Sequence, residues 1–343
     1  MKGIQFTEPL HIAMSAWPDD PSPGPGEALV RTHRMGICGS DLSGYLGQMP
    51  FFSYPRIPGH ELGLEVLEAG AGVTHLKPGD RCSLEPYVND PATPTSQQGA
   101  SNCCPNVQVL GVHADGGLRQ SAWIVPARKL HAGNDLTYDQ LALVETLAIG
   151  RHAVQRGDPR PGQTALVIGA GPIGLACLEF LKLIDLQVIV LDRVQGRLDF
   201  VKGHIPSVIP LTASDLESDL ERVREATSGR LADVVIDATG SAVSMSQCFE
   251  FAAFTGRVVY VGITTGTLSF PHAPLFHRRE LTLLASRNAL PADFPEIIRL
   301  ISEGKIHTDP WITHRLLFDE VPARFGAFTD PSLGAIKVVI SVS

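Results

Sequence analysis

Short apolar runs separated by turn residues dominate the first 150 positions of the chain. The runs EALVRTHRMGI, GLEVLEAG, DRCSLEPYV and QSAWIVPARKL are typical of β-strands, and the clusters PSPGPGE and KPGD are typical of the turns between them. This alternation predicts a compact domain with the character of a β-barrel.

From about residue 150 the pattern changes to alternating strands and helices. TALVIGAGPIG, LACLEFLKLI and QVIVLD follow one another as strand, helix and strand, which is the βαβ unit of a parallel sheet. ADVVIDATG and GRVVYVGI predict two more buried strands, and ELTLLAS predicts a last one. We therefore expect an α/β domain with a doubly wound parallel sheet of the Rossmann type over residues 150–287.

The last part of the chain returns to mixed character, with a helical run FPEIIRLISEGK and a final strand AIKVVISV. We assign this part to the first domain, which is then discontinuous over residues 1–149 and 288–343. Segment 89–102, NDPATPTSQQGASN, contains almost no apolar residue and predicts either a mobile loop or a solvated lobe.

Composition and charge narrow the classes of function. A chain of 343 residues exceeds what one hydrophobic core usually supports. The net charge of −8 argues against a nucleic-acid or anionic membrane partner. The longest apolar stretch, 165–178, is broken by three glycines and a proline and is too short to span a bilayer. Six cysteines without a secretory signal predict free thiols and a cytoplasmic protein.

One short pattern contains a set of metal-ligand types. Cys38 lies in MGICGSDL, and the tripeptide Gly-His-Glu occupies positions 59–61. A Cys thiolate, a His imidazole and a Glu carboxylate together suit Zn²⁺, which accepts sulfur, nitrogen and oxygen ligands in a tetrahedral site. A dinucleotide-binding fingerprint follows later in the chain. The two features together predict hydride transfer assisted by a metal ion.

The fingerprint itself is GAGPIG at 169–174, which follows the apolar strand TALVI and opens a helix. Asp192 ends the next strand, where its carboxylate is expected to accept the adenosine ribose hydroxyls. That carboxylate favours NAD because it would repel the extra phosphate of NADP by about 4 kcal/mol at an effective dielectric of ~20. Two arginines close by oppose this preference, and the alternative is a glycine-rich turn without a ligand. The expected cofactor-binding residues are Gly169, Gly171, Pro172, Ile173, Gly174, Asp192, Arg193, Arg197, Thr239, Gly240, Val261 and Gly262.

Several motifs together resemble the zinc-containing medium-chain dehydrogenase/reductases, in their polyol dehydrogenase branch, over essentially the whole chain. They are GICGSD, PGHELGLEV, KPGDR, ETLAIGRHA and GAGPIGL. EPY, NCC, VLGVHADGG and ASRNALPADFPEIIRLISEGKI further resemble bacterial dehydrogenases of sugar acids such as L-galactonate and L-gulonate. The resemblance implies a GroES-like catalytic domain beside the Rossmann domain, an NAD-dependent activity and a homodimer or homotetramer.

The resemblance also implies ligands for one catalytic zinc. Cys38 and His60 match the first two ligand positions of the family, and Glu145 matches the position that completes the set. Glu61 either binds the metal directly or exchanges with water, so the identity of the ligating glutamate stays open.

Two further positions carry implied roles beside the metal. Asp41 matches a carboxylate that orients the His60 ring, and Ser40 matches the hydroxyl that takes the substrate proton. The alternative for Ser40 is a turn serine that satisfies the local backbone. Many relatives carry a histidine three residues beyond this serine, where this chain has Ser43. The proton would then leave through cofactor hydroxyls and water, or through another histidine, for which His113 and His152 are candidates.

A second departure concerns the structural zinc that relatives hold through four cysteines. The matching positions here are Asp90, Thr93, Ser96 and Cys104. Three thiolates are missing, and Thr and Ser are poor zinc ligands, so we expect one zinc per subunit and no structural site. The lobe is then either more mobile or held by packing, and Cys103 and Cys104 are expected to be inert rather than to act as a redox pair.

Substrate contacts are the least determined part of the site. Tyr45 and Arg287 match positions that contact substrate hydroxyls in polyol dehydrogenases, and Arg287 either pairs with a carboxylate or caps backbone carbonyls. Phe51 and Phe52 are either pocket walls or core. His277, Arg278 and Arg279 are interpreted as a solvated face.

The sequence therefore predicts a zinc- and NAD-dependent oxidation of a secondary hydroxyl in a sugar acid or polyol. Alternatives are a threonine or simple secondary-alcohol dehydrogenase of the same family and a relative that binds nucleotide without catalysis. The zinc-free quinone reductases of the same fold lack the ligand set.

Overall fold

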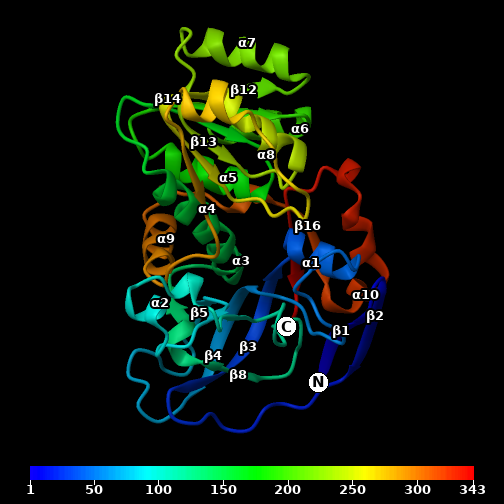
Figure 1. Cartoon of the computed structure of the whole chain (residues 1–343). Coiled ribbons are helices and arrows are strands. Elements are labelled where there is room, and N and C mark those ends of the chain that lie inside the picture. The colour runs from blue at the N-terminus through cyan, green and yellow to red at the C-terminus, as the bar shows by residue number, and fades with distance from the viewer. The chain divides into compact units, whose positions relative to one another are not determined.

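In the computed structural model, which describes all residues from Met1 to Ser343, two stretches that are distant in sequence fold together (Figure 1). Met1–Glu145 and Leu290–Ser343 form the first unit, and Thr146–Ala289 forms the second. The tail, Leu290–Ser343, thus belongs to the first unit. No helix in the structure combines the length and apolarity needed to cross a membrane.

A seven-stranded sheet forms the centre of the first unit. Its path is β16 (Ile312–Leu317), β17 (Lys337–Ser341), β3 (Glu27–Gly36), β4 (Glu61–Ala69), β5 (Arg81–Leu84) and β9 (Leu130–Ala132), with β8 (Trp123–Pro126) paired to β3. Only the β16–β17 pair is parallel. The tail strand β17 is inserted between β16 and β3, so residues from both ends of the chain are neighbours in this sheet.

Alternating burial along β3 explains how this sheet packs. Ala28, Val30 and Thr32 point to the buried side, while the residues between them are partly exposed. The Trp123 ring from β8 lies on the same side and donates its Nε1–H to Thr32 Oγ1 at 3.1 Å. A side-chain period of two with one buried face is expected for an antiparallel sheet that covers a core.

The remaining elements of the first unit are short. A hairpin of β1 (Lys2–Glu8) and β2 (His11–Ala16) and a separate two-stranded sheet of β6 (Tyr87–Val88) and β7 (Gln108–Val109) accompany the central sheet. The helices are α1 (Gly39–Tyr45), α2 (Pro94–Gln97), α3 (Tyr138–Ala142), α9 (Asp293–Ser302) and α10 (Val321–Arg324). The β1–β2 hairpin and β16 were not anticipated from the apolar pattern. Segment 89–102 is a structured lobe that contains α2 and a 3-10 turn at Ser101–Cys103.

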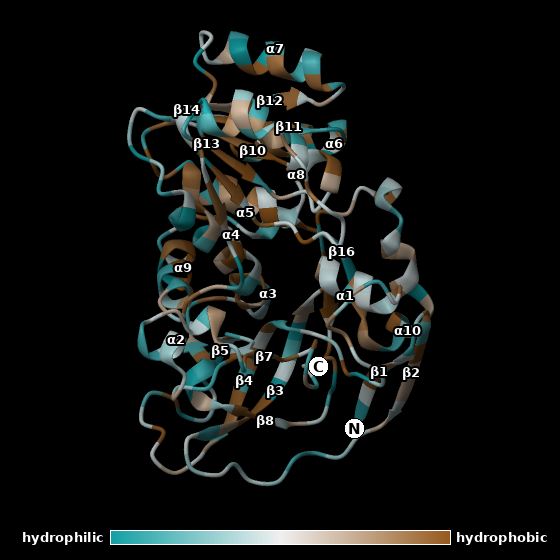
Figure 2. Ribbon diagram, viewed as in Figure 1, coloured by the Kyte–Doolittle hydropathy of each residue, from teal (hydrophilic) through white to brown (hydrophobic).

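The second unit contains a parallel sheet, as predicted, with six strands where five were expected. Its order is β12 (Ile209–Thr212), β11 (Gln187–Asp192), β10 (Thr164–Ile168), β13 (Ala232–Asp237), β14 (Ala252–Tyr260) and β15 (Thr282–Ala285). All five residues of β10 are buried, which agrees with the continuous apolar run of a strand covered on both faces. Figure 2 shows the same apolar character in the neighbouring strands.

The strand order determines which face of the sheet the helices of the second unit cover. They are α4 (Val144–Gly157), which begins in the first unit, α5 (Pro172–Leu181), α6 (Gln195–His204), α7 (Leu216–Ala226) and α8 (Ala242–Gln247). The chain moves outward from β10 to β12 and then returns to β13. Because such crossovers are right-handed, helices before and after the return cover opposite faces of the sheet. The order reverses at β10, so the first βα turn opens at the switch point where dinucleotides bind in such sheets.

Candidate metal centre and dinucleotide site

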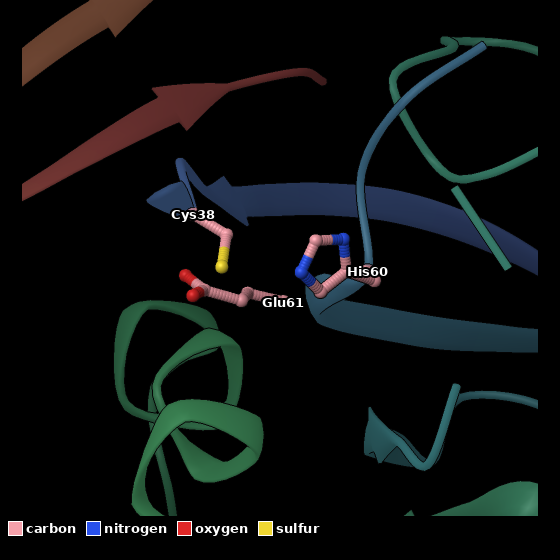
Figure 3. Close-up of side chains that lie close together, drawn as sticks. All are labelled: Cys38, His60 and Glu61. Carbon is pink, nitrogen blue, oxygen red and sulfur yellow. The ribbon is translucent and has the colours of Figure 1, made fainter. Parts of the chain in front are cut away.

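Three side chains of the first unit converge on one point (Figure 3). The Cys38 sulfur, a ring nitrogen of His60 and a carboxylate oxygen of Glu61 all lie within 4.8 Å of one another. Zn–S and Zn–N bonds of about 2.3 and 2.0 Å place tetrahedral ligands roughly 3–4 Å apart. The group therefore needs only small movements to coordinate a zinc ion, and its sulfur, nitrogen and oxygen atoms are of suitable types.

Backbone pairing between β3 and β4 creates this convergence. Gly36 is the register partner of Glu61, and Cys38 follows two residues later as the N-cap of α1. A Cβ atom on Gly36 would lie 2.2 Å from Glu61 Oε2. Only glycine at position 36 leaves room for the carboxylate, so the strand pairing and the ligand position depend on each other.

The second ring nitrogen of His60 faces Asp41. His60 Nδ1 lies 3.6 Å from Asp41 Oδ1, and Asp41 Oδ2 accepts the Cys38 backbone N–H at 2.9 Å. Both side chains are buried, and neither His60 Nδ1 nor Asp41 Oδ1 has a closer polar partner. This arrangement favours a proton on Nδ1 and a lone pair on Nε2, as in many metal-bound histidines. Ser40 Oγ lies 3.3 Å from His60 Nε2, so the serine predicted to act in catalysis lies at the centre.

Glu61 has a partner that sequence reasoning missed. Lys337 Nζ in β17 lies 2.6 Å from both carboxylate oxygens and 3.3 Å from the Ile37 carbonyl oxygen. Both side chains are almost fully buried. The signal was a lysine within the apolar run AIKVVISV, because lysine is rarely buried without a partner.

Glu145 has a separate partner, which was also missed. The Tyr87 hydroxyl of β6 donates a hydrogen bond to Glu145 Oε1, and both residues are buried. Glu145 does not belong to the group of three converging ligand atoms, although it influences the same histidine. The structure thus holds one carboxylate, Glu61, within the group and a second, Glu145, beside it.

The charges of this region favour a cation. Burial alone would lower the pKa of His60, but Asp41 and Cys38 outweigh it and hold that pKa well above its usual value. Burial likewise opposes the charged form of Lys337, and the Glu61 carboxylate reverses this, so the pKa of Lys337 is raised. Burial raises the pKa of Glu145. A cluster of acidic groups that draws positive charge onto its neighbours is also suited to a divalent ion.

In the second unit, the loop after β10 has the form that a bound pyrophosphate requires. Gly171 caps α5 and Pro172 occupies its first turn. A Cβ atom on Gly174 would lie 1.7 Å from the Gly169 carbonyl oxygen, so only glycine permits this packing of helix against strand. The free N–H groups at the start of α5 can bind an anion.

Asp192 shapes the adjoining cavity of about 340 Å³. Its carboxylate accepts backbone N–H groups of Ala170 at 2.6 Å and Val194 at 2.7 Å, and Arg197 Nη1 lies 3.7 Å away. Of the predicted cofactor residues, those lining the cavity are Gly169, Gly171, Asp192, Arg193, Arg197 and Thr239. Those outside its lining are Pro172, Ile173, Gly174, Gly240, Val261 and Gly262.

A buried aspartate supports the rim of this cavity and was not anticipated. Asp237 accepts hydrogen bonds from the Thr239 backbone at 2.9 Å, the Thr239 hydroxyl at 2.7 Å and the Ser244 hydroxyl at 2.5 Å. Its position at the end of the buried strand β13 is the signal that was available. Asp237 thereby fixes the turn that carries Thr239.

The positions assigned to substrate contacts lie in different units. Tyr45 is part of an aromatic cluster with Phe6 and Phe325 in the first unit, with ring centroids 5.9 and 5.5 Å away. Phe52 packs on the same cluster, whereas Phe51 is 58% exposed. Arg287 is an exposed residue shortly after β15 in the second unit.

The structure also shows where the other histidines and arginines considered in the sequence analysis lie. His113 Nδ1 accepts the Val109 backbone N–H at 3.0 Å, and His152 is buried in α4. Of the three residues interpreted as a solvated face, His277 and Arg278 are exposed. Arg279 is not part of such a face, because its guanidinium donates to the Glu250 and Ala252 carbonyl oxygens at 2.9 and 2.8 Å.

Comparison with known proteins supports the description of both units, the first with its candidate metal centre and the second with its dinucleotide fold. Residues 24–135 match the family described as alcohol dehydrogenase GroES-like domain, and residues 172–303 match the family described as zinc-binding dehydrogenase. These matches confirm the predicted fold class, a GroES-like domain together with a Rossmann-type parallel sheet.

Individual relatives are similar over most of their length. L-Galactonate-5-dehydrogenase of Escherichia coli (strain K12) is 39% identical over 298 residues, which cover 87% of this chain and 86% of the relative. L-Arabinitol 4-dehydrogenase of Aspergillus oryzae is 32% identical over 332 residues, covering 92% and 86%. A crystal structure from E. coli CFT073, described as a short chain alcohol dehydrogenase (rspB) complexed with NADH, superimposes with a TM-score of 0.89 at 28% identity and 99% coverage of both chains.

Proposed function

Because this chain belongs to the zinc-binding dehydrogenases that carry an alcohol dehydrogenase GroES-like domain, we propose that it oxidises a secondary hydroxyl of a sugar acid or polyol with NAD as acceptor. The observation that carries the proposal is the convergence of Cys38, His60 and Glu61 in the first unit of a chain whose second unit has a dinucleotide fold. Relatives named for L-galactonate and L-arabinitol support the substrate class.

Cys38, His60 and Glu61 would hold the zinc ion, and Glu145 is the nearby carboxylate that could exchange with Glu61. When bound, zinc acts as a Lewis acid that lowers the pKa of a coordinated hydroxyl, and NAD supplies the hydride acceptor. The fit rests on the ligand chemistry and on the two buried polar atoms, His60 Nδ1 and Asp41 Oδ1, that have only each other as partners.

The chain's own residues then have distinct tasks. Asp41 orients the His60 ring so that Nε2 faces the ligand group. Ser40, whose Oγ lies 3.3 Å from His60 Nε2, accepts the proton of the substrate hydroxyl while it passes its own hydroxyl proton on. Lys337 holds the Glu61 carboxylate in place through both oxygens. With Ser43 in the position of the relay histidine, we infer that the proton continues to cofactor hydroxyls and water.

NAD rather than NADP is the proposed cofactor. The cavity beside Gly171 is lined by the Asp192 carboxylate, which can accept ribose hydroxyls and repels a 2′-phosphate. Replacing Asp192 by serine should raise the ratio of kcat/KM for NADP to that for NAD by up to roughly 10³-fold, the equivalent of about 4 kcal/mol. A wild-type enzyme that prefers NADP ten-fold or more would contradict the assignment.

We further propose one catalytic zinc per subunit, a substrate carboxylate or hydroxyl contacted by Arg287 and Tyr45, and a cytoplasmic homodimer or homotetramer. Six unpaired cysteines agree with a reducing compartment. The edge strand β15 has an exposed Leu283, which agrees with burial of this edge in an oligomer.

A substrate panel tests the proposal directly. Aldonates, polyols, threonine and butanediol are offered with NAD, and NADH formation is followed by absorbance before and after treatment with a chelator. We expect turnover with sugar acids or polyols that is lost with the metal and restored by zinc. Turnover that persists in fully metal-free protein, or NADH binding without turnover of any compound, would contradict it.

A further inference from the structure

The lobe between β6 and β7 closes around a single sulfur atom. The chain leaves β6 at Val88 and returns at Gln108, and Cys104 near the end of this excursion is 1% exposed. The Asp90 backbone N–H donates to Cys104 Sγ at 3.4 Å, and Thr93 Oγ1 lies 3.4 Å from the same sulfur. The beginning and the end of the lobe are therefore joined at this atom.

Hydroxyl groups complete the cluster. Thr93 Oγ1 lies 2.9 Å from Ser96 Oγ and 3.0 Å from the Asp90 carbonyl oxygen. Ser96 Oγ also accepts from Asn89 Nδ2 at 3.0 Å. Thr93 is 9% exposed and contacts three of the other members, so it is the centre of the hydrogen-bond network.

These residues occupy the four positions at which relatives carry zinc-binding cysteines, and the set does not fit zinc. Thr and Ser hydroxyls keep their protons at neutral pH and are not the usual ligands of structural zinc, which are thiolates and imidazoles. The Asp90 carboxylate is already used, since Oδ1 accepts the Ala92 N–H at 2.9 Å and Oδ2 lies 3.4 Å from Asn106 Nδ2. Cys104 is the only remaining ligand of the required type.

The base of the lobe is also tied to the rest of the first unit. Arg128 donates to the Asn89 side-chain oxygen at 2.8 Å and to its carbonyl oxygen at 2.7 Å. Tyr87, which directly precedes the lobe in β6, reaches Glu145 beside the metal centre. A change in the lobe can therefore reach the centre through two residues.

We propose that Asp90, Thr93, Ser96 and Cys104 form a metal-free clasp, which replaces a structural metal in closing the lobe and keeps Tyr87 in position to hold Glu145. The clasp depends on the proposed function in one respect only, namely that each subunit binds a single zinc ion. Its tests need no substrate, so they can fail independently of the proposed activity.

Limited proteolysis of the lobe, read by mass spectrometry, is the first test. In wild-type protein, removal of zinc by a chelator should change the rate of cleavage within residues 89–107 far less than the loss of the Thr93 hydroxyl does, because the zinc reaches the lobe only through Tyr87 and Glu145. Thr93→Val keeps the shape of the side chain and removes the central hydroxyl, and it should raise that rate about 5–30-fold, the effect of losing one or two hydrogen bonds. Thr74→Val, the same change at an exposed position without a hydrogen-bond role, is the control.

The same samples test the link to the metal centre. In Co²⁺-loaded protein, Thr93→Val should shift the visible absorption of the metal, as Tyr87→Phe does, whereas Thr74→Val should not. Chelation that speeds cleavage of the wild-type lobe as much as Thr93→Val does would overturn the proposal. Equal cleavage of the Thr93→Val and Thr74→Val proteins would do so as well, and so would a cobalt spectrum that responds to Tyr87→Phe but not to Thr93→Val.

Restoring the thiolates is an independent test. The triple variant Asp90→Cys/Thr93→Cys/Ser96→Cys presents four cysteines around one point and should bind one metal ion more per chain than the wild type. Its Co²⁺ form should show an additional intense thiolate charge-transfer band. A wild-type protein that already binds two zinc ions per chain, or a triple variant that gains none, would contradict the clasp.

Discussion

Replacing Lys337 by methionine removes the positive charge from the buried ion pair that Lys337 forms with Glu61 at the metal centre. The Lys337 ammonium lies 2.6 Å from both Glu61 oxygens, and the two side chains are 2% and 1% exposed. Methionine keeps most of the length and volume of lysine and removes the charge together with the 3.3 Å hydrogen bond to the Ile37 carbonyl oxygen. Glu61 is then left as a buried carboxylate beside the acidic groups of Asp41 and Glu145.

Breaking one half of a buried ion pair costs about 3–5 kcal/mol of unfolding free energy. At about 2–4 °C per kcal/mol for a domain of this size, the unfolding temperature of zinc-free Lys337→Met protein should fall by roughly 6–20 °C. Zinc gives Glu61 a second positive partner, so the loss should be clearly smaller in zinc-loaded protein. A Glu61→Gln/Lys337→Met double variant should recover part of the loss in the zinc-free state, because neither charge is then unpaired.

Thermal unfolding followed by circular dichroism, with and without zinc, measures all of these differences. Lys305→Met is the matched control, since Lys305 forms a solvent-exposed pair with Glu303, and such pairs contribute little to stability. An equal loss of stability in the zinc-free and zinc-loaded states would show that Glu61 is not a metal ligand. A loss no larger than that of Lys305→Met would refute the buried-charge reasoning altogether.

Three further predictions concern single residues. Ser40→Ala should lower kcat by about 10²–10⁴-fold while the zinc content measured by mass spectrometry is unchanged, and retained turnover would remove this serine from the mechanism. Tyr87→Phe should weaken zinc binding by about 10–100-fold, measured by competition with a chromophoric chelator; wild-type affinity would show that Glu145 needs no phenol partner. In iodoacetamide labelling of native protein, exposed Cys103 should react, whereas Cys82, whose pKa burial raises to about 12, should react only after unfolding. Rapid labelling of Cys82 would contradict that burial.

The sequence was most informative where the physical signal is local. The parallel sheet was predictable because buried strands such as Thr164–Ile168 are unbroken apolar runs. The edge strand Ile209–Thr212 was missed, since it is four residues long, only partly buried and contains Pro210. Helix α2 in the lobe was missed for a similar reason, because a proline and three polar residues after a threonine cap carry no apolar period.

The candidate metal centre shows the same limit. Cys38, His60 and Glu61 come from motifs that the sequence displays, and the structure brings these three together. Lys337 lies 276 positions away from its partner Glu61, and no periodicity relates the two. In the sequence, Tyr87 was only one residue of the EPY motif, and Asp237 was only the last residue of a predicted strand. Their roles depend on which atoms the fold brings within hydrogen-bond distance.

The discontinuous first unit has a consequence for the order of events during translation. A ribosome delivers β3 and β4 early, but β17, which pairs with β3, emerges only after the whole parallel-sheet unit has been synthesised. Until then β3 has no strand partner opposite β4 at Arg34–Gly36, since β8 pairs only with Glu27–Val30, and Glu61 lacks the Lys337 ammonium. Folding of the second unit can proceed meanwhile, so the metal centre is among the last parts of the protein to mature.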